Sequence, residues 1–380
     1  MPLLTTRCAL LACRTLLAAT MFVGLLTSCK NDKDDPATDL FGTYDRRAML
    51  TRIRDGAARP AFGELTAAAD TLRLATQLLT AASTPAELAS CQTAWLAAAK
   101  AWKSSELFAA FGPGEALNLA GSIGMETNPT VIDNALADSA PITQSYLDTR
   151  PAAAKGIWAL EYLLFERGAQ GNAAVLARLT TAPGADRRRA YLQALAAELP
   201  ARTAAVRNEW TTGAYASAFV DADGNDVSSS LSLLVNASVQ VVEAIKNERL
   251  GRPLGDLNGG TPQPETAEGY RSGTSDVFIT QSLLSLDGVW AGAPGRSVLN
   301  GLLDHLGAQA AGGQPLSSAI ADQLAATRAR VSPDVASLVD QQRQPVVELQ
   351  AEVKKLTVLL KAEAVSKLGV LLTFNDNDGD

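Results

Sequence analysis

The chain has 380 residues, of which 47% are hydrophobic, and it carries a formal net charge of −7 at pH 7. That length is sufficient for one large domain or two ordinary domains, each with an apolar core. The acidic balance argues against nucleic acid as a partner, because a phosphate backbone attracts basic surfaces. The same balance permits attraction of cations.

Residues 1–28 have the layout of a secretory signal. Arg7 and Arg14 supply positive charge, an apolar stretch runs from residue 16 to residue 26, and the sequence LTSC ends at Cys29. The apolar stretch is shorter than the ~20 residues that span a bilayer. LTSC resembles the lipobox of bacterial lipoproteins, which implies cleavage after Ser28 and lipid on Cys29.

Residues 29–43 are predicted to form a flexible acidic tether, because their charged and polar side chains have nothing to bury. Only Cys91 lies outside the signal and the lipid site, so we expect no intramolecular disulfide. Lys30, and not Asp, follows the expected lipidated cysteine, so an inner-membrane retention signal is absent. We therefore expect a cell-envelope protein that is lipid-anchored at the outer membrane, on its periplasmic or its surface face.

Helix is the element that the remaining sequence indicates most strongly. The clearest helix follows Thr84, which is a predicted N-cap with Pro85 at the first helical position and Glu87 at the third. Apolar and small residues continue to Phe111, where Gly-Pro follows. Apolar spacing and helix-ending residues predict further helices at about 60–82, after 129, and at 151–166, 186–212, 228–250, 275–290, 317–330 and 345–372.

Alternation of β-branched residues is nearly absent, so we predict an all-α fold. Short connections favour two antiparallel helical bundles. The Gly- and Pro-rich run at 259–264 is the best internal boundary. It would separate a first part at 44–258 from a second part at 265–374, and an acidic tail at 375–380 would follow.

Few motifs with a defined chemistry are present. The acidic loops at 221–226 and 375–380 suggest calcium, yet their glycines are misplaced for an EF-hand loop and no Glu follows at the required spacing. His305 is the single histidine, so no Ser/His/Asp or Cys/His arrangement can be argued. The sequence also has no H-E-x-x-H zinc motif, no Gly-rich phosphate loop and no dinucleotide fingerprint.

The segment at 155–165, KGIWALEYLLF, is almost wholly apolar, and Glu161 is its only acid. An ionised carboxylate in such surroundings needs a partner or a metal ion. Two interpretations stay open. Glu161 accepts hydrogen bonds from the backbone or from a Tyr, Arg or Lys elsewhere, or it is a ligand-binding or catalytic carboxylate in a cleft.

The sequence GIWALEYLLF at 156–165 resembles the signature of the imelysin-like family, in which G-x-H-x-x-E precedes an apolar run. Further stretches agree in the family's order: Trp102 with ELFAAFGP at 106–113, the central region at 228–255, EGYRSGTS at 268–275, and the end from 368 onward. The resemblance implies two helical bundles that face each other across a cleft, with the signature at the cleft. It also implies a cell-envelope protein linked to uptake of iron or another metal, and a family label of metallopeptidase.

One departure from the family pattern matters most. Trp158 stands where the pattern has His, and an indole nitrogen donates a hydrogen bond but has no lone pair for a metal. The expected cleft site therefore consists of Gly156, Trp158, Glu161 and, by the resemblance, Glu106. The two carboxylates with waters could hold a hard cation such as iron or calcium. They do not make an ordinary zinc-peptidase site, which uses imidazole or thiolate ligands.

We therefore expect a non-catalytic imelysin-like lipoprotein, associated with metal (iron) uptake, that binds a ligand or an envelope partner protein in its cleft. Trp158 suits an organic group or a peptide side chain better than a bare ion. One alternative is a metal-binding uptake component that uses only the carboxylates Glu106 and Glu161. The other is a metallopeptidase, which the missing histidine disfavours.

Overall fold

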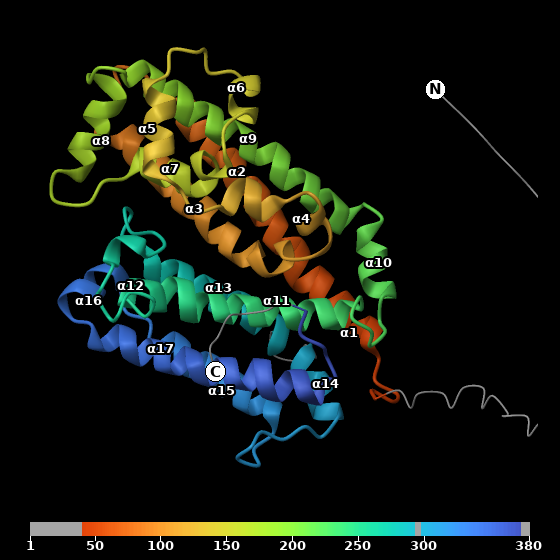
Figure 1. The fold of residues 1–380 in the computed structure, drawn as a ribbon. Coiled ribbons are helices and arrows are strands. Elements are labelled where there is room, and N and C mark those ends of the chain that lie inside the picture. The colour runs from red at the N-terminus through yellow and green to blue at the C-terminus, as the bar shows by residue number, and fades with distance from the viewer. Residues whose placement is uncertain (1–39, 293–297, 374–380) are drawn as a thin grey trace, which may run out of the picture. The chain divides into compact units, whose positions relative to one another are not determined.

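Two bundles of helices make up the residues that the computed structural model describes, which are 40–292 and 298–373 (Figure 1). The only β-pairing within these ranges is an isolated bridge between Gln309 and Pro315. The predicted all-α class with two antiparallel bundles facing across a cleft is confirmed. The expected signal, Cys29, most of the tether and the acidic tail lie outside the described residues.

The first bundle is built on three long helices, of which α2 packs against both α3 and α9. Shorter helices cover them (Figure 1). The elements are α1 (Arg46–Ile53), the π-helical segment η1 (Arg54–Ala58), α2 (Arg59–Gln77), α3 (Pro85–Ala109), α4 (Gly112–Ala116), the π-helical η2 (Ala120–Gly124), α5 (Pro129–Ala137), α6 (Gln144–Asp148), the 3-10 turn η3 (Ala152–Ala154), α7 (Gly156–Leu164), α8 (Gly171–Thr180), α9 (Ala185–Thr211) and α10 (Tyr215–Asp221).

The second bundle packs α17 against both α11 and α15, and α13 lies against α11 and α15. The elements are α11 (Ser230–Ala244), the π-helical η4 (Ile245–Gly251), α12 (Arg252–Leu254), the 3-10 turn η5 (Pro264–Thr266), α13 (Ser275–Trp290), α14 (Leu299–His305), α15 (Leu316–Ala329), α16 (Val335–Gln341), α17 (Gln344–Thr357), the π-helical η6 (Val358–Ala364) and α18 (Val365–Lys367). No helix in the described residues is both long enough and apolar enough to cross a bilayer.

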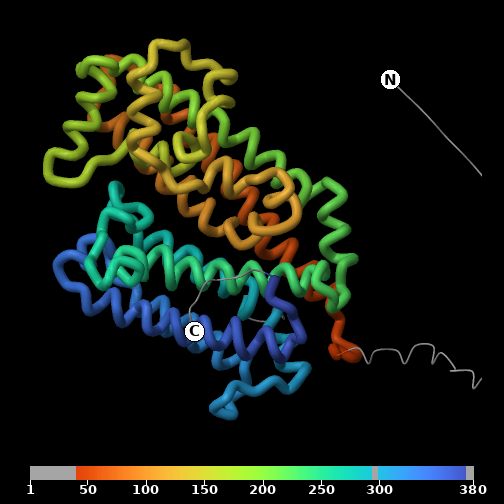
Figure 2. The backbone as a smooth tube through the Cα atoms, in the orientation of Figure 1, coloured from red at the N-terminus to blue at the C-terminus, as the bar shows by residue number. Residues whose placement is uncertain are grey.

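The two bundles meet where α3 lies along α13 and α11, and the orange and teal tubes of Figure 2 run side by side there. Helix α11 precedes the Gly- and Pro-rich run at 259–264, yet it packs against α13 and α17. The chain therefore passes from one bundle to the other before α11, and residues 259–263 lie in the loop between α12 and η5, which begins at Pro264. The expected limits of the two parts as separate domains stay a prediction.

Helix α3 begins as its sequence predicts. The Thr84 backbone N–H donates to the Glu87 carboxylate over 2.6 Å, and the Thr84 hydroxyl lies 2.9 Å from the same oxygen. This reciprocal cap satisfies donors that the first turn of a helix leaves without partners. The cap fixes the start of α3, and α3 carries Glu106 near its other end.

The predicted helix at 151–166 is wrong in one respect, because it is broken immediately before the family signature. Lys155 is extended, and Gly156 adopts a φ of +78° at the start of α7. A Cβ atom on Gly156 would lie 2.5 Å from the Ile123 carbonyl oxygen of η2. A side chain is excluded both by the left-handed conformation and by this close approach. Glycine thus lets α7 start against η2, which is where the cleft lies.

Candidate functional site

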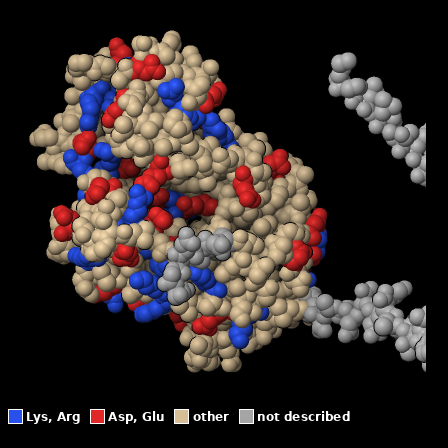
Figure 3. Space-filling model, in the orientation of Figure 1, with Lys and Arg blue, Asp and Glu red and all other residues tan. Residues whose placement is uncertain are grey.

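A cleft of about 530 Å³ opens between the two bundles. Its first wall carries Glu106 of α3, Gly124 of η2, and Trp158 and Glu161 of α7. Its second wall is formed by η4 and the segment at 265–271. Acidic and basic side chains gather around this hollow in Figure 3. Three of the four positions expected at the site therefore meet in one cleft, while Gly156 supports the start of α7.

Both walls of the cleft use π-helical segments. Gly124 ends η2, and Glu248 and Arg249 lie within η4, and all three line the cleft. A π-helical turn is less favourable than an α-helical one and is found mostly at functional sites, where it re-aims side chains. Here η4 continues α11 directly, so the change of winding turns Arg249 toward the first bundle.

Four charged side chains, two of them buried, join the walls in a closed arrangement that we call the charge square: Lys103, Glu106, Arg249 and Glu268. The Lys103 ammonium lies 2.9 Å from one oxygen of Glu106 and 2.5 Å from Glu268. Arg249 holds the other oxygens, at 2.5 Å from Glu106 and 3.0 Å from Glu268. The side chains of Lys103 and Arg249 are only 2% and 5% exposed. The side chains of Glu106 and Glu268 are 25% and 22% exposed, so two buried cations balance two half-buried anions at the edge of the cleft.

The charge square fixes the ionisation of Glu106. Burial alone would raise the pKa of this carboxyl, but Arg249 and Lys103 outweigh burial and bring the pKa to about 2. The same neighbours act on the guanidinium, because Glu106 and Glu268 raise the pKa of Arg249 against the opposing effect of burial. Arg249 also donates to the Ser282 hydroxyl over 2.7 Å. Glu106 and Arg249 are thus both charged at neutral pH.

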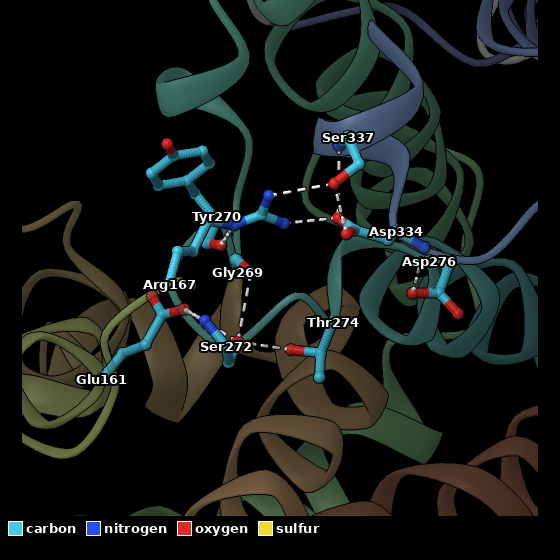
Figure 4. Close-up of polar contacts among 9 residues, drawn as sticks. All are labelled: Glu161, Arg167, Gly269, Tyr270, Ser272, Thr274, Asp276, Asp334 and Ser337. Atoms are coloured by element: carbon cyan, nitrogen blue, oxygen red, sulfur yellow. Dashed lines mark hydrogen bonds and ion pairs between the residues drawn. The ribbon is translucent and has the colours of Figure 1, made fainter. Parts of the chain in front are cut away.

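Glu161 has a different environment. It is 7% exposed, and a single oxygen, Oε1, accepts from the Ser272 backbone N–H at 2.9 Å and from the Ser272 hydroxyl at 2.8 Å (Figure 4). The other oxygen, Oε2, accepts no hydrogen bond from the residues that the structure describes. Burial raises the pKa of Glu161, and the Ser272 hydrogen bonds and Arg271 offset that effect only in part. The Ser272 backbone N–H agrees with the first sequence interpretation. Glu161 also lines the cleft, and its role there as a ligand-binding carboxylate stays a prediction.

The raised pKa of Glu161 predicts a specific dependence of stability on pH. The native protein holds the proton more tightly than the unfolded chain, whose carboxyl has the ordinary pKa of 4.5. The free energy of unfolding should therefore fall as the pH rises from about 4.5 through the raised pKa. Urea unfolding across this range should show that Glu161→Gln, which does not titrate, loses less stability than the wild type. The exposed Glu64→Gln should keep the wild-type slope, and an equal slope for Glu161→Gln would contradict the prediction.

Besides the charge square, a second set of interactions connects the two bundles, and it lies beside Glu161. Arg167, which follows α7, donates to the Tyr270 carbonyl and to the Ser337 hydroxyl, the latter over 3.1 Å, and lies 2.5 Å from Asp334 (Figure 4). Its guanidinium also stacks over the Tyr270 ring. The segment that carries Tyr270 and Ser272 is therefore held by α7 on one side and by the start of α16 on the other. This segment forms part of the second wall of the cleft.

Trp158 fills the position where the family pattern has His. Its indole N–H donates to the Gly124 carbonyl over 3.0 Å, and the side chain is buried. Its ring packs edge-on against Phe278 at 5.2 Å between ring centres. The Lys103 ammonium lies 5.3 Å from the Trp158 ring centre, which is within range of a cation–π contact. Trp158 thus contacts the inner wall of the cleft through Gly124 and Phe278, and the charge square through Lys103.

The residues present do not fit a resident metal ion. Trp158 offers no lone pair, and both oxygens of Glu106 are held by cations of the charge square. Within residues 40–292 and 298–373, no three His, Cys, Asp or Glu side chains converge as a ligand group. We therefore derive no chemical step through a metal.

Reasoning from sequence missed three members of the charge square and Ser272. Glu268 and Ser272 belong to the EGYRSGTS stretch, but their types alone indicate no partner. Lys103 and Glu106 are three residues apart on α3, and that spacing is the one local signal available. Arg249 approaches Glu106 across 143 residues of sequence, so no local pattern indicates it.

The fold and the site define a class of protein: an all-α, two-bundle protein whose charged cleft is built around an apolar helix. Residues 58–362 match the model of the Imelysin family, which bears the peptidase M75 name. The match covers well over half of the chain, and the protein belongs to the Imelysin family.

Solved structures show the same fold. An imelysin-like protein from Psychrobacter arcticum 273-4 aligns with a TM-score of 0.68 and 20% identity, over 87% of this chain and 97% of its own. A protein from Parabacteroides distasonis ATCC 8503, described as an iron-regulated protein A precursor, aligns with a TM-score of 0.69 and 17% identity, over 89% and 97%. No curated protein matches the sequence.

Proposed function

We propose that this chain is a non-catalytic binding protein of the cell envelope, and that its cleft holds an organic ligand or a peptide side chain beside Trp158 and Glu161. The observation that carries the proposal is the free oxygen of Glu161 in a buried position of a cleft of about 530 Å³. That volume lies within the range of about 300–1,000 Å³ typical of small-molecule sites. An amine or guanidinium group suits the free oxygen, because it would favour the ionised carboxylate.

The residues of the cleft support binding over hydrolysis. A zinc peptidase needs imidazole or thiolate ligands and an activated water, and position 158 offers only an indole N–H that already donates to Gly124. The other carboxylate, Glu106, is neutralised by Lys103 and Arg249. Glu161 does accept a hydrogen bond from the Ser272 hydroxyl, but Ser272 is not among the residues that line the cleft. We therefore propose that the cleft has an anchor for a ligand and no reaction centre.

The cellular setting rests on other observations. Cys29 follows a lipobox-like sequence, so we propose a lipid anchor that displays the helical body at the outer membrane. Membership of the Imelysin family, and a structural neighbour described as iron-regulated, are compatible with a role in iron uptake. A partner protein of the envelope would meet the anchored body there.

The lipid anchor can be tested by substitution of the lipidated cysteine. Cys29→Ser should abolish incorporation of radiolabelled palmitate, and persistence of the label would contradict the anchor.

Ligand class can be tested by tryptophan fluorescence. The purified chain would be titrated with tripeptides that differ only in one central residue: Lys, Arg, Leu or Phe. We expect the Lys and Arg peptides to bind at least tenfold more tightly than the Leu peptide, and Glu161→Gln to remove that preference. Glu64→Gln, an exposed acid of α2, should behave as wild type. Chelator-sensitive cleavage of an unfolded protein substrate would overturn the non-catalytic proposal.

Restoring the family histidine alone should not create a metal site. In Trp158→His the new imidazole would lie near the Lys103 ammonium, which is 5.3 Å from the present ring centre, while Glu106 stays neutralised. We expect zinc binding by this variant, measured by competition with a chromogenic chelator, to equal that of wild type. One additional zinc per chain at micromolar affinity would show that Glu106 and Glu161 are available as ligands.

A further inference from the structure

We propose that Lys103 is an internal cation that excludes metal from the cleft, and that its ammonium occupies the position that a divalent ion would take between Glu106 and Glu268. This inference does not depend on which organic ligand the cleft binds. It assigns a role to a residue that is 98% buried. A lysine is almost never fully buried unless it is paired, so the fold must supply Lys103 with its carboxylate partners.

The geometry supports the substitution of one cation for another. The ammonium is 2.9 Å from a Glu106 oxygen and 2.5 Å from a Glu268 oxygen. Hard divalent ions bind carboxylate oxygens at about 2.0–2.6 Å. An ion at the ammonium position would therefore draw in the Glu106 oxygen by about 0.3–0.9 Å and the Glu268 oxygen by at most about 0.5 Å. Waters in the adjoining cleft would complete its coordination.

Glu161 lines the same cleft as Glu106 and Glu268. It is buried, and its Oε2 atom accepts no hydrogen bond from the described residues. Among these residues no three His, Cys, Asp or Glu side chains converge as a ligand group, so the ion would be held by Glu106, Glu268 and waters, and Glu161 would act only through its charge. The formal charges of the square sum to zero with Lys103 present. Without Lys103 they sum to −1, which favours a divalent ion in its place.

Trp158 stabilises the ammonium in this place. The aromatic face lies 5.3 Å from the Lys103 nitrogen, and a ring face attracts a cation without competing for its hydrogen bonds. The indole N–H is turned away toward Gly124. Trp158 thus favours an organic cation at this point of the cleft and offers nothing to a metal.

The test uses the purified chain without a histidine tag. Lys103→Met keeps the buried stem and removes the charge. Lys100→Met is the matched control, because Lys100 is exposed on the same helix three residues earlier. Lys103→Met/Glu106→Gln gives the baseline for ions held elsewhere on the acidic surface. Equilibrium dialysis with Mn²⁺ measures the bound ion, and thermal unfolding with Mn²⁺ or Ca²⁺ provides a second readout.

We expect Lys103→Met to bind one Mn²⁺ per chain above the baseline and to gain several degrees in Tm when the ion is added. Wild type and Lys100→Met should stay at the baseline and show no such shift. Binding by wild type above the baseline would overturn the proposal. So would a folded Lys103→Met that stays at the baseline. If Lys103→Met does not fold, Lys103→Gln replaces it, because the amide keeps a donor for the carboxylates and carries no charge.

Discussion

Replacement of Arg249 by methionine is expected to lower the free energy of unfolding by about 3–5 kcal/mol. The guanidinium is 5% exposed and touches Glu106, Glu268 and the Ser282 hydroxyl. Without it, two half-buried carboxylates would share the single charge of Lys103. The large loss comes mainly from leaving one anion without a compensating charge, since an intact buried pair contributes little net stability by itself.

Urea unfolding at neutral pH would measure this change. Arg252→Met is the matched control, because Arg252 lies three residues further on and pairs with Glu126, whose side chain is 64% exposed. Exposed pairs contribute about 0–1 kcal/mol, so the control should unfold nearly as wild type does. A loss below about 1 kcal/mol for Arg249→Met would show that water reaches the charge square in solution.

Trp158→Ala is expected to cost about 3–5 kcal/mol, because it removes a buried aromatic side chain and leaves a cavity in the inner wall of the cleft. The change also leaves the Gly124 carbonyl without the indole donor and removes the ring that faces Lys103. The measurement is again urea unfolding. Trp158→Phe, which keeps an aromatic ring but not the N–H, should lose markedly less. Equal losses for the two variants would show that the indole hydrogen bond, and not packing, dominates.

The class of fold could be predicted from local sequence. The capping box at Thr84, the long apolar periodicities and the near absence of β-branched alternation all describe interactions within a few residues. The short helices α6, α8, α10, α14 and α16 were not predicted, since they are only 5–10 residues long. The break before Gly156 also escaped prediction, because its cause is the approach of Ile123 from another element.

The site could be predicted only in part. The family resemblance placed Glu106, Trp158 and Glu161 together, and all three line one cleft. What it did not supply was the partners of these acids, which are Lys103 and Arg249 for Glu106 and Ser272 for Glu161. Arg249 and Ser272 come from distant parts of the sequence, so these contacts are non-local. From the sequence alone Glu106 therefore appears free to bind a metal ion, whereas in the folded protein its oxygens are already paired with Lys103 and Arg249.

Four sets of interactions cross from one bundle to the other at the cleft: the charge square, the Glu161–Ser272 hydrogen bonds, Arg167 with Asp334, and Arg252 with Glu126. A protein that opens and closes its two bundles around a ligand would have to break such interactions in every cycle of ligand exchange. This one would instead receive its ligand through an opening that already exists. Association in a stopped-flow experiment should accordingly be a single exponential, with a rate that rises linearly with ligand concentration and reaches no plateau.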